Sequence, residues 1–145
     1  MEQIKISEEM SEYVENIDQV EKILNQCEYD LEYIGEDSHN KQFKYILHIN
    51  DIKFDYFEGI GNKPLNEENK QDKILNAVWC LLSDRQCVIN SRDFYDFVCE
   101  YGYNENSEQL KKGKEIYEAI KINNEKLLKC FSEEQLDFLT DNIQL

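Results

Sequence analysis

The chain opens with a helical pattern of apolar positions. Over residues 7–26 these positions fall three or four residues apart, which predicts one amphipathic helix. The apolar stripe consists of Met10, Tyr13, Val14, Ile17, Val20 and Leu24. Ser7 is the expected N-cap, and Glu8 and Glu9 fall in the first turn, where the helix dipole favours negative charge.

A period of two replaces the helical period between residues 29 and 56. Residues 29–34, 43–49 and 52–56 place apolar side chains at alternate positions, which predicts three β-strands. Asn50 and Asp51 suit a tight hairpin turn between the last two strands, because both residue types tolerate positive φ. One register keeps the apolar side chains on one face: Ile49 opposite Ile52, Leu47 opposite Phe54 and Tyr45 opposite Tyr56.

Helical spacing returns after a break at residues 59–64. Helices are expected over 72–83, around 94–101, from 106 or 107 to 128, and over 132–139. Gly102 is expected to end the second of these helices with a positive φ. Ser132 and Gln135 fit a capping box. The other expected N-caps are Asn90 or Ser91, and Asn106 or Ser107.

This order of elements predicts an α+β fold, with an N-terminal helix, a three-stranded antiparallel β-meander and four C-terminal helices packed on the sheet. With 145 residues, the chain has the length of one domain. Within it, residues 1–40 form the acidic helix and first strand, 41–62 the hairpin and 65–145 the helical part. No stretch approaches the ~20 apolar residues of a membrane span, and no signal peptide is recognisable. We therefore expect a cytoplasmic protein.

Negative charge is concentrated near the N-terminus. The chain has 31 acidic and 16 basic residues, a net charge of −15. Residues 1–40 alone contain 12 acidic and 2 basic residues, a net charge of −10. Such a chain repels nucleic acid and anionic membranes, so we expect neither as a direct ligand, and it favours a basic protein partner. A general bias towards solubility would not produce this uneven distribution.

Few residues are suited to catalysis. His39 and His48 are the only histidines, and no Cys–His or Ser–His–Asp arrangement is recognisable. Residues 59–61 read GxG but lack the third glycine and following helix of a dinucleotide-binding loop. The five cysteines lack CxxC spacing and fall mostly on apolar helix stripes, which indicates buried, reduced thiols. We therefore expect no enzymatic activity, no cofactor and no metal site.

Residues 43–131 resemble a family of small uncharacterised proteins of phages and mobile elements. The shared pattern includes residues 54–61, Pro64 and the segment 94–104, which reads FYDFVCEYGYN. The family pattern is F-x-D-F-x-x-E-F-G-Y-D, and here Tyr101 replaces its third phenylalanine and Asn104 replaces its final aspartate. The resemblance transfers no reaction. It implies a role in phage or mobile-element biology, and some proteins of this appearance inhibit bacterial defence, anti-CRISPR proteins included. The acidic first 40 residues lie outside it.

The acidic N-terminal segment is the expected partner-binding site. Its candidate residues are Glu8, Glu9, Glu12, Glu15, Asp18, Glu21, Glu28, Asp30, Glu32, Glu36 and Asp37. A helix stripe with a carboxylate every three or four residues has one charge per about 5–6 Å, whereas duplex DNA has one per ~1.7 Å. Steric blocking with charge steering therefore fits better than a copy of the phosphate backbone. The alternative is a solvated acidic helix face with no partner.

Three functions remain open at this point. The first is an anti-CRISPR inhibitor that binds the basic surface of a CRISPR nuclease or surveillance complex in the bacterial host cell. The second is an accessory phage protein with a structural or regulatory partner, which could be a homodimer formed through exposed tyrosines. The third is a small hydrolase acting on a nucleotide signal, but the basic cluster at Lys111, Lys112 and Lys114 resembles a solvated helix face rather than a phosphate pocket.

Overall fold

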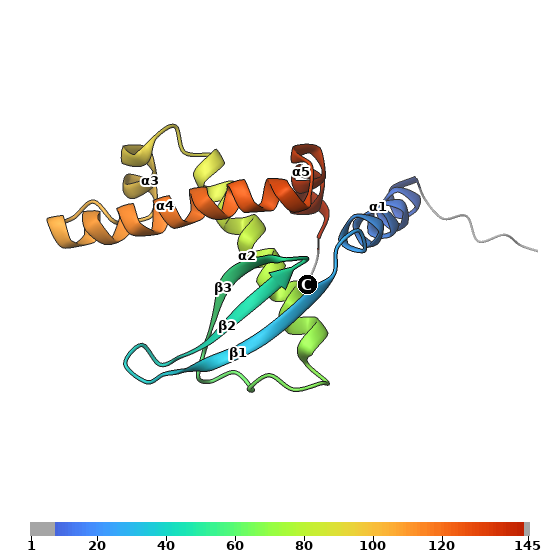
Figure 1. The fold of residues 1–145 in the computed structure, drawn as a ribbon. Helices are drawn as coiled ribbons and strands as arrows, with labels where there is room; N and C mark the ends of the chain where they lie inside the picture. Colours follow the sequence, from blue (N-terminus) through green and yellow to red (C-terminus); the bar gives the residue numbers. More distant parts are fainter. Residues whose placement is uncertain (1–7, 144–145) are drawn as a thin grey trace, which may run out of the picture.

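A three-stranded antiparallel sheet and five helices make up the described part of the chain (Figure 1). The structure, a computed structural model, describes residues 8–143, with side chains from residue 15 onward. The elements are α1 (Glu8–Leu24), β1 (Tyr29–Asp37), β2 (Gln42–Ile49), β3 (Ile52–Gly59), α2 (Lys70–Ile89), α3 (Phe94–Glu100), α4 (Ser107–Cys130) and α5 (Glu133–Asn142). The predicted α+β fold is confirmed. Ser7, the predicted N-cap of the first helix, lies outside the described residues.

The predicted hairpin register is confirmed at all three residue pairs. Strand β2 lies between β1 and β3, and Ile49, Leu47 and Tyr45 face Ile52, Phe54 and Tyr56 respectively. Asn50 adopts a φ of 55°, as the expected tight turn requires. Strand β1 runs three residues further than predicted, because it continues past an irregularity between Tyr33 and Gly35.

In the described part of the chain, helices cover only one face of the sheet. Every second side chain of β2 is fully or almost fully buried, while the residues between them are half-buried. The covered face shares one core with α2, the end of α4, and α5. In Figure 1, α2 lies behind the sheet and α4 crosses its upper end. The C-terminal half of α1 joins this core through Val20 and Ile23 and packs against α5.

Helix α3 belongs to a second, smaller core. Phe97 and Val98 of α3 pack with Ile120 of α4 and with Cys87 and Val88 at the end of α2. The sequence placed this aromatic helix on the sheet, and here the structure differs. Helix α2 extends to Ile89, six residues beyond the predicted end, and its additional turns support α3 away from the sheet (Figure 1).

The helix caps explain where the later helices begin. Ser132 and Gln135 form the predicted capping box, and Asn106 caps α4. For α3 the prediction of Asn90 or Ser91 is wrong, because the cap is Asp93, whose side chain accepts a hydrogen bond from the Asp96 backbone amide. The Asp93 carboxylate therefore stabilises the N-terminus of α3, a helix of only seven residues.

Gly113 allows Tyr103 and Val98 to approach α4 closely in the second core. It is buried in α4, and a Cβ atom added there would lie 2.7 Å from Tyr103 Cβ and 3.1 Å from a methyl group of Val98. Gly102 has a φ of 79°, as predicted for the residue that ends α3, and it turns the chain so that Tyr103 returns to α4.

The five cysteines are all free thiols. Cys27 is buried and Cys99 is exposed. Burial raises the pKa of the Cys130 thiol to about 11, with a further contribution from nearby Cys27. In the described part of the chain, no helix has the length and apolar character needed to span a membrane.

Thiol reactivity is expected to follow this burial. Ellman's reagent at pH 8 should modify Cys99 first and Cys130 last, because only on the order of 0.1% of a thiol with a pKa near 11 is ionised there. Peptide mapping by mass spectrometry at successive times measures the order. Equal rates at Cys99 and Cys130 in the native protein would contradict the placement of Cys130, and Cys99→Ser should remove the fast phase.

Replacing Gly113 by alanine should destabilise the protein by about 1–3 kcal/mol. Alanine would gain about 1 kcal/mol of helix propensity, but its Cβ would overlap Tyr103 Cβ, which is attached directly to the backbone and cannot rotate away. Urea unfolding followed by circular dichroism measures the difference. Gly61→Ala is the matched control, because nothing lies within 4 Å of its added Cβ. A Gly113→Ala protein as stable as the control would refute the close contact.

Candidate functional site

Five of the predicted partner-binding carboxylates are free on the surface. Glu15, Asp18, Glu21, Glu28 and Glu36 are exposed, and within residues 15–143 none of their side chains has an ion pair or hydrogen bond. Three further candidates, Glu8, Glu9 and Glu12, lie outside the residues whose side chains are described. The free carboxylates come from α1, from the segment that joins α1 to β1, and from the far end of β1.

The remaining three candidates are held by contacts within the protein. Asp30 forms an ion pair with Lys70 at 2.5 Å, and this hydrogen bond lowers the pKa of the Asp30 carboxyl group. Glu32 Oε1 lies 3.1 Å from His48 Nε2. Asp37 accepts hydrogen bonds from the Asn40 side chain and from two backbone amides of the β1–β2 turn, and these bonds lower its pKa.

Because Asp30, Glu32 and Asp37 have partners within the protein, the free carboxylates do not form a continuous row along β1. Glu28 and Glu36 remain free but are separated by about 26 Å of extended chain. Glu15, Asp18 and Glu21 follow one another at three-residue intervals on α1, which points away from the rest of the molecule in Figure 1. The free charge is therefore spread along an extended surface at a density far below that of duplex DNA. It can attract a basic surface without copying a phosphate backbone.

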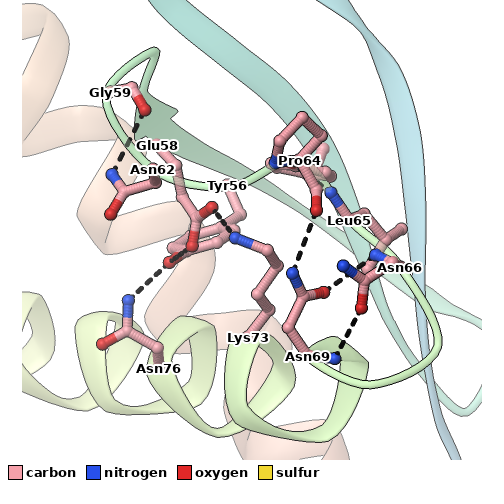
Figure 2. A network of polar contacts seen from close by, with 11 residues as sticks. Tyr56, Glu58, Gly59, Asn62, Pro64, Leu65, Asn66, Asn69, Lys73 and Asn76 are labelled. Atoms are coloured by element: carbon pink, nitrogen blue, oxygen red, sulfur yellow. Dashed lines mark hydrogen bonds and ion pairs between the residues drawn. The ribbon is translucent and has the colours of Figure 1, made fainter.

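A second polar cluster lies between β3 and α2 (Figure 2). Lys73 Nζ forms an ion pair with Glu58 Oε1, and both side chains are only 9% exposed. The Tyr56 hydroxyl donates to Glu58 Oε2 at 2.7 Å, and Asn76 Nδ2 donates to the Tyr56 hydroxyl at 2.5 Å. Burial and the bond to Glu58 raise the pKa of the Tyr56 phenol, so it keeps its proton as a donor. Lys73 Nζ also lies 5.8 Å from the centre of the Tyr45 ring.

The loop before α2 closes one side of this cluster. Asn66 and Asn69 each accept a hydrogen bond from the backbone amide of the other, at 2.9 and 2.8 Å. Asn69 Nδ2 also donates to the Pro64 carbonyl (Figure 2). The Tyr45 hydroxyl accepts a hydrogen bond from the Leu65 amide. This side-chain network fixes the segment between the end of β3 and Lys70.

An open groove of about 630 Å³ lies above the ion pair. Its lining combines both charges and several amides: Glu58, Asn62, Lys63, Asn69, Asp72, Lys73, Leu75 and Asn76. Glu58 and Lys73 therefore form the buried floor of a site that is accessible from solvent. Among the described residues, no group of three or more His, Cys, Asp and Glu side chains is arranged to hold a metal ion.

Sequence reasoning did not identify this second site. One signal was present: Lys73 lies four residues before Ala77 and next to Ile74, so it falls on the apolar face of a helix, where an unpaired lysine is rare. Its partner Glu58 lies at the end of a strand, and no local pattern connects the two residues.

No protein family, curated protein or solved structure matches this chain. The resemblance to phage and mobile-element proteins therefore stays a prediction.

Removing one partner of the buried ion pair should destabilise the protein strongly. Lys73→Met leaves the Glu58 carboxylate buried without its cation, and we expect a loss of about 3–5 kcal/mol. Adding Glu58→Gln removes the uncompensated charge and keeps an acceptor for Tyr56, so the double variant should recover more than half of the loss. Urea unfolding followed by circular dichroism measures both. A single variant within about 0.5 kcal/mol of the parent protein would contradict the buried pairing.

Proposed function

We propose that this protein is a non-catalytic binding protein whose acidic N-terminal surface docks on a basic protein. The observation that carries the proposal is the set of five exposed carboxylates on α1, on β1 and in the segment between them, which have no partner within residues 15–143 and belong to a segment with a net charge of −10. Other carboxylates of this segment contact Lys70 and His48, so the fold gives some acidic residues a partner and leaves these five without one in the described residues.

The partner class follows from charge and from the sequence resemblance. A surface with this charge attracts the basic groove of a nucleic-acid-binding protein and repels nucleic acid itself. The resemblance to phage and mobile-element proteins supports a target in bacterial defence, and our specific proposal is an anti-CRISPR inhibitor acting on a nuclease or surveillance complex. Because the charge density of this surface is low, steric blocking of the partner's basic groove fits better than mimicry of a DNA duplex.

A specific observation favours a second candidate, an accessory protein that self-associates. The sheet face that no described helix covers has an exposed aromatic side chain, because Phe57 lies opposite Lys44 on that face and is 47% exposed. Two such faces could pack against one another. A monomeric mass by light scattering at 100 μM would exclude this candidate, and a dimer that loses its affinity in Phe57→Lys would support it.

Neutralising four of the five free carboxylates should weaken partner binding about tenfold or more. The test variant is Glu15→Gln, Asp18→Asn, Glu21→Gln and Glu36→Gln combined, and the measured quantity is the affinity for a complex recovered by pull-down from lysates containing CRISPR and restriction systems. Binding of the parent protein should weaken steeply between 50 and 300 mM salt, because exposed charges are screened over about 8 Å at physiological ionic strength.

The matched control carries four equivalent changes on another face. Glu105, Glu115, Glu118 and Glu125 are exposed residues of α4 and the preceding loop, and their glutamine variants change the net charge by the same amount. The control should bind within about twofold of the parent protein. Equal weakening in both variants would assign the effect to net charge and refute the surface. Recovery of no defence protein from verified lysates would oppose the anti-CRISPR proposal.

A further inference from the structure

The groove between β3 and α2 is a separate candidate site. It lies outside residues 1–40 and depends on none of the free carboxylates of the N-terminal surface. Its floor is the Lys73–Glu58 pair, which is buried at a cost that a pair of packed apolar side chains would avoid. An accessible groove over a buried ion pair is the kind of place where ligands are recognised.

The hydrogen bonds within the cluster determine which atoms face the groove. The single proton of the Tyr56 hydroxyl goes to Glu58, so this hydroxyl must accept from Asn76 Nδ2. Asn76 therefore presents its Oδ1 acceptor away from Tyr56. Asn62 donates its Nδ2 to the Gly59 carbonyl and likewise leaves its Oδ1 free. Figure 2 shows Asn62 and Asn76 on the same side of the Tyr56–Glu58 pair, and both line the groove.

The charges in the groove favour a cation. Asp72 lies one helical turn before Asn76 on α2, so its exposed carboxylate and the Asn76 amide share a face. The ammonium group of Lys73 is compensated by its contact with Glu58. Lys63 also lines the groove, but it is exposed on a long side chain that can extend into solvent. With a net charge of −15, the molecule as a whole attracts cations and repels anions.

We infer that this groove binds a guanidinium group, such as an arginine side chain of a peptide or protein ligand. Two amide oxygens and a carboxylate from opposite walls offer acceptors in several directions, which a planar group with five donors can satisfy together. An ammonium group is a compact point charge and matches such a spread set less well. The buried pair positions Tyr56 and Asn76 and thereby orients the acceptor that faces the ligand.

The test is a titration of the ¹⁵N-labelled protein with Nα-acetyl-arginine amide, followed by NMR. Saturable shifts of the Asn62 and Asn76 side-chain amide signals are expected, with a Kd on the order of 1 mM for a ligand of this size. The citrulline analogue, which is similar in shape but uncharged, should bind at least fivefold more weakly. Nα-acetyl-lysine amide should also bind more weakly than the arginine compound.

Variants identify the groove as the site. Asp72→Asn should weaken binding of the arginine compound at least fivefold, and Asn62→Ala is a second variant on the opposite wall that should also weaken it. Asp141→Asn is the matched control, because Asp141 is an exposed aspartate of α5 that does not line the groove. Unsaturable shifts, equal binding of the citrulline analogue, or equal effects of Asp72→Asn and Asp141→Asn would each overturn the assignment. These outcomes leave the N-terminal surface untouched, since its test uses different residues and a different ligand.

Discussion

The covered face of the sheet is the constraint on which the rest of the structure depends. Strand β2 lies between two antiparallel neighbours and places Tyr45, Leu47 and Ile49, each with no exposed surface, against the helices. Because side chains alternate along a strand, a slip of one residue would turn all of them to solvent. Helices α2 and α5 are held where they cover this face, and α1 is held where it meets α5.

A buried ion pair adds specificity to this apolar packing. Apolar surfaces can slide, whereas the Lys73–Glu58 pair has a low energy in only one relative position of β3 and α2. Tyr56 and Asn76 extend the pair into a chain of hydrogen bonds that leaves no partner of the pair unsatisfied. Arg85 makes a comparable connection between α2 and α5: its side chain is 4% exposed and donates to Asp137 at 3.0 Å. Ion pairs therefore hold α2 near its N-terminus, through Lys73, and near its C-terminus, through Arg85.

Acidic side chains have partners in one part of the molecule and lack them in another. On β1, Asp30 pairs with Lys70 and Glu32 contacts the His48 ring, whereas the carboxylates of Glu15, Asp18 and Glu21 on α1 have no partner in the described residues. A helix that meets the body mainly through its C-terminal half is well placed to present charge at a distance from the core (Figure 1). The proposed docking surface and the proposed guanidinium groove both favour cations.

Local rules were sufficient for much of the fold. The hairpin register followed from the side-chain period of two, the end of α3 from Gly102, and the beginnings of α4 and α5 from Asn106 and Ser132. These features depend on residues within a few positions of one another. The prediction for α3 was less successful, because both a sheet and a second helix can bury an aromatic stripe, and the choice depended on the six additional residues of α2.

The sequence by itself determined the fold class, the register and the location of the excess acidic charge. Only the tertiary structure decided which carboxylates are free, because the pairing of Asp30 with Lys70 joins residues 40 positions apart that share no local pattern. The groove could not be predicted for the same reason, because Glu58 and Lys73 form a pair only when β3 and α2 pack together. Periodicity reports which face of an element is buried, but it does not report which element will face it.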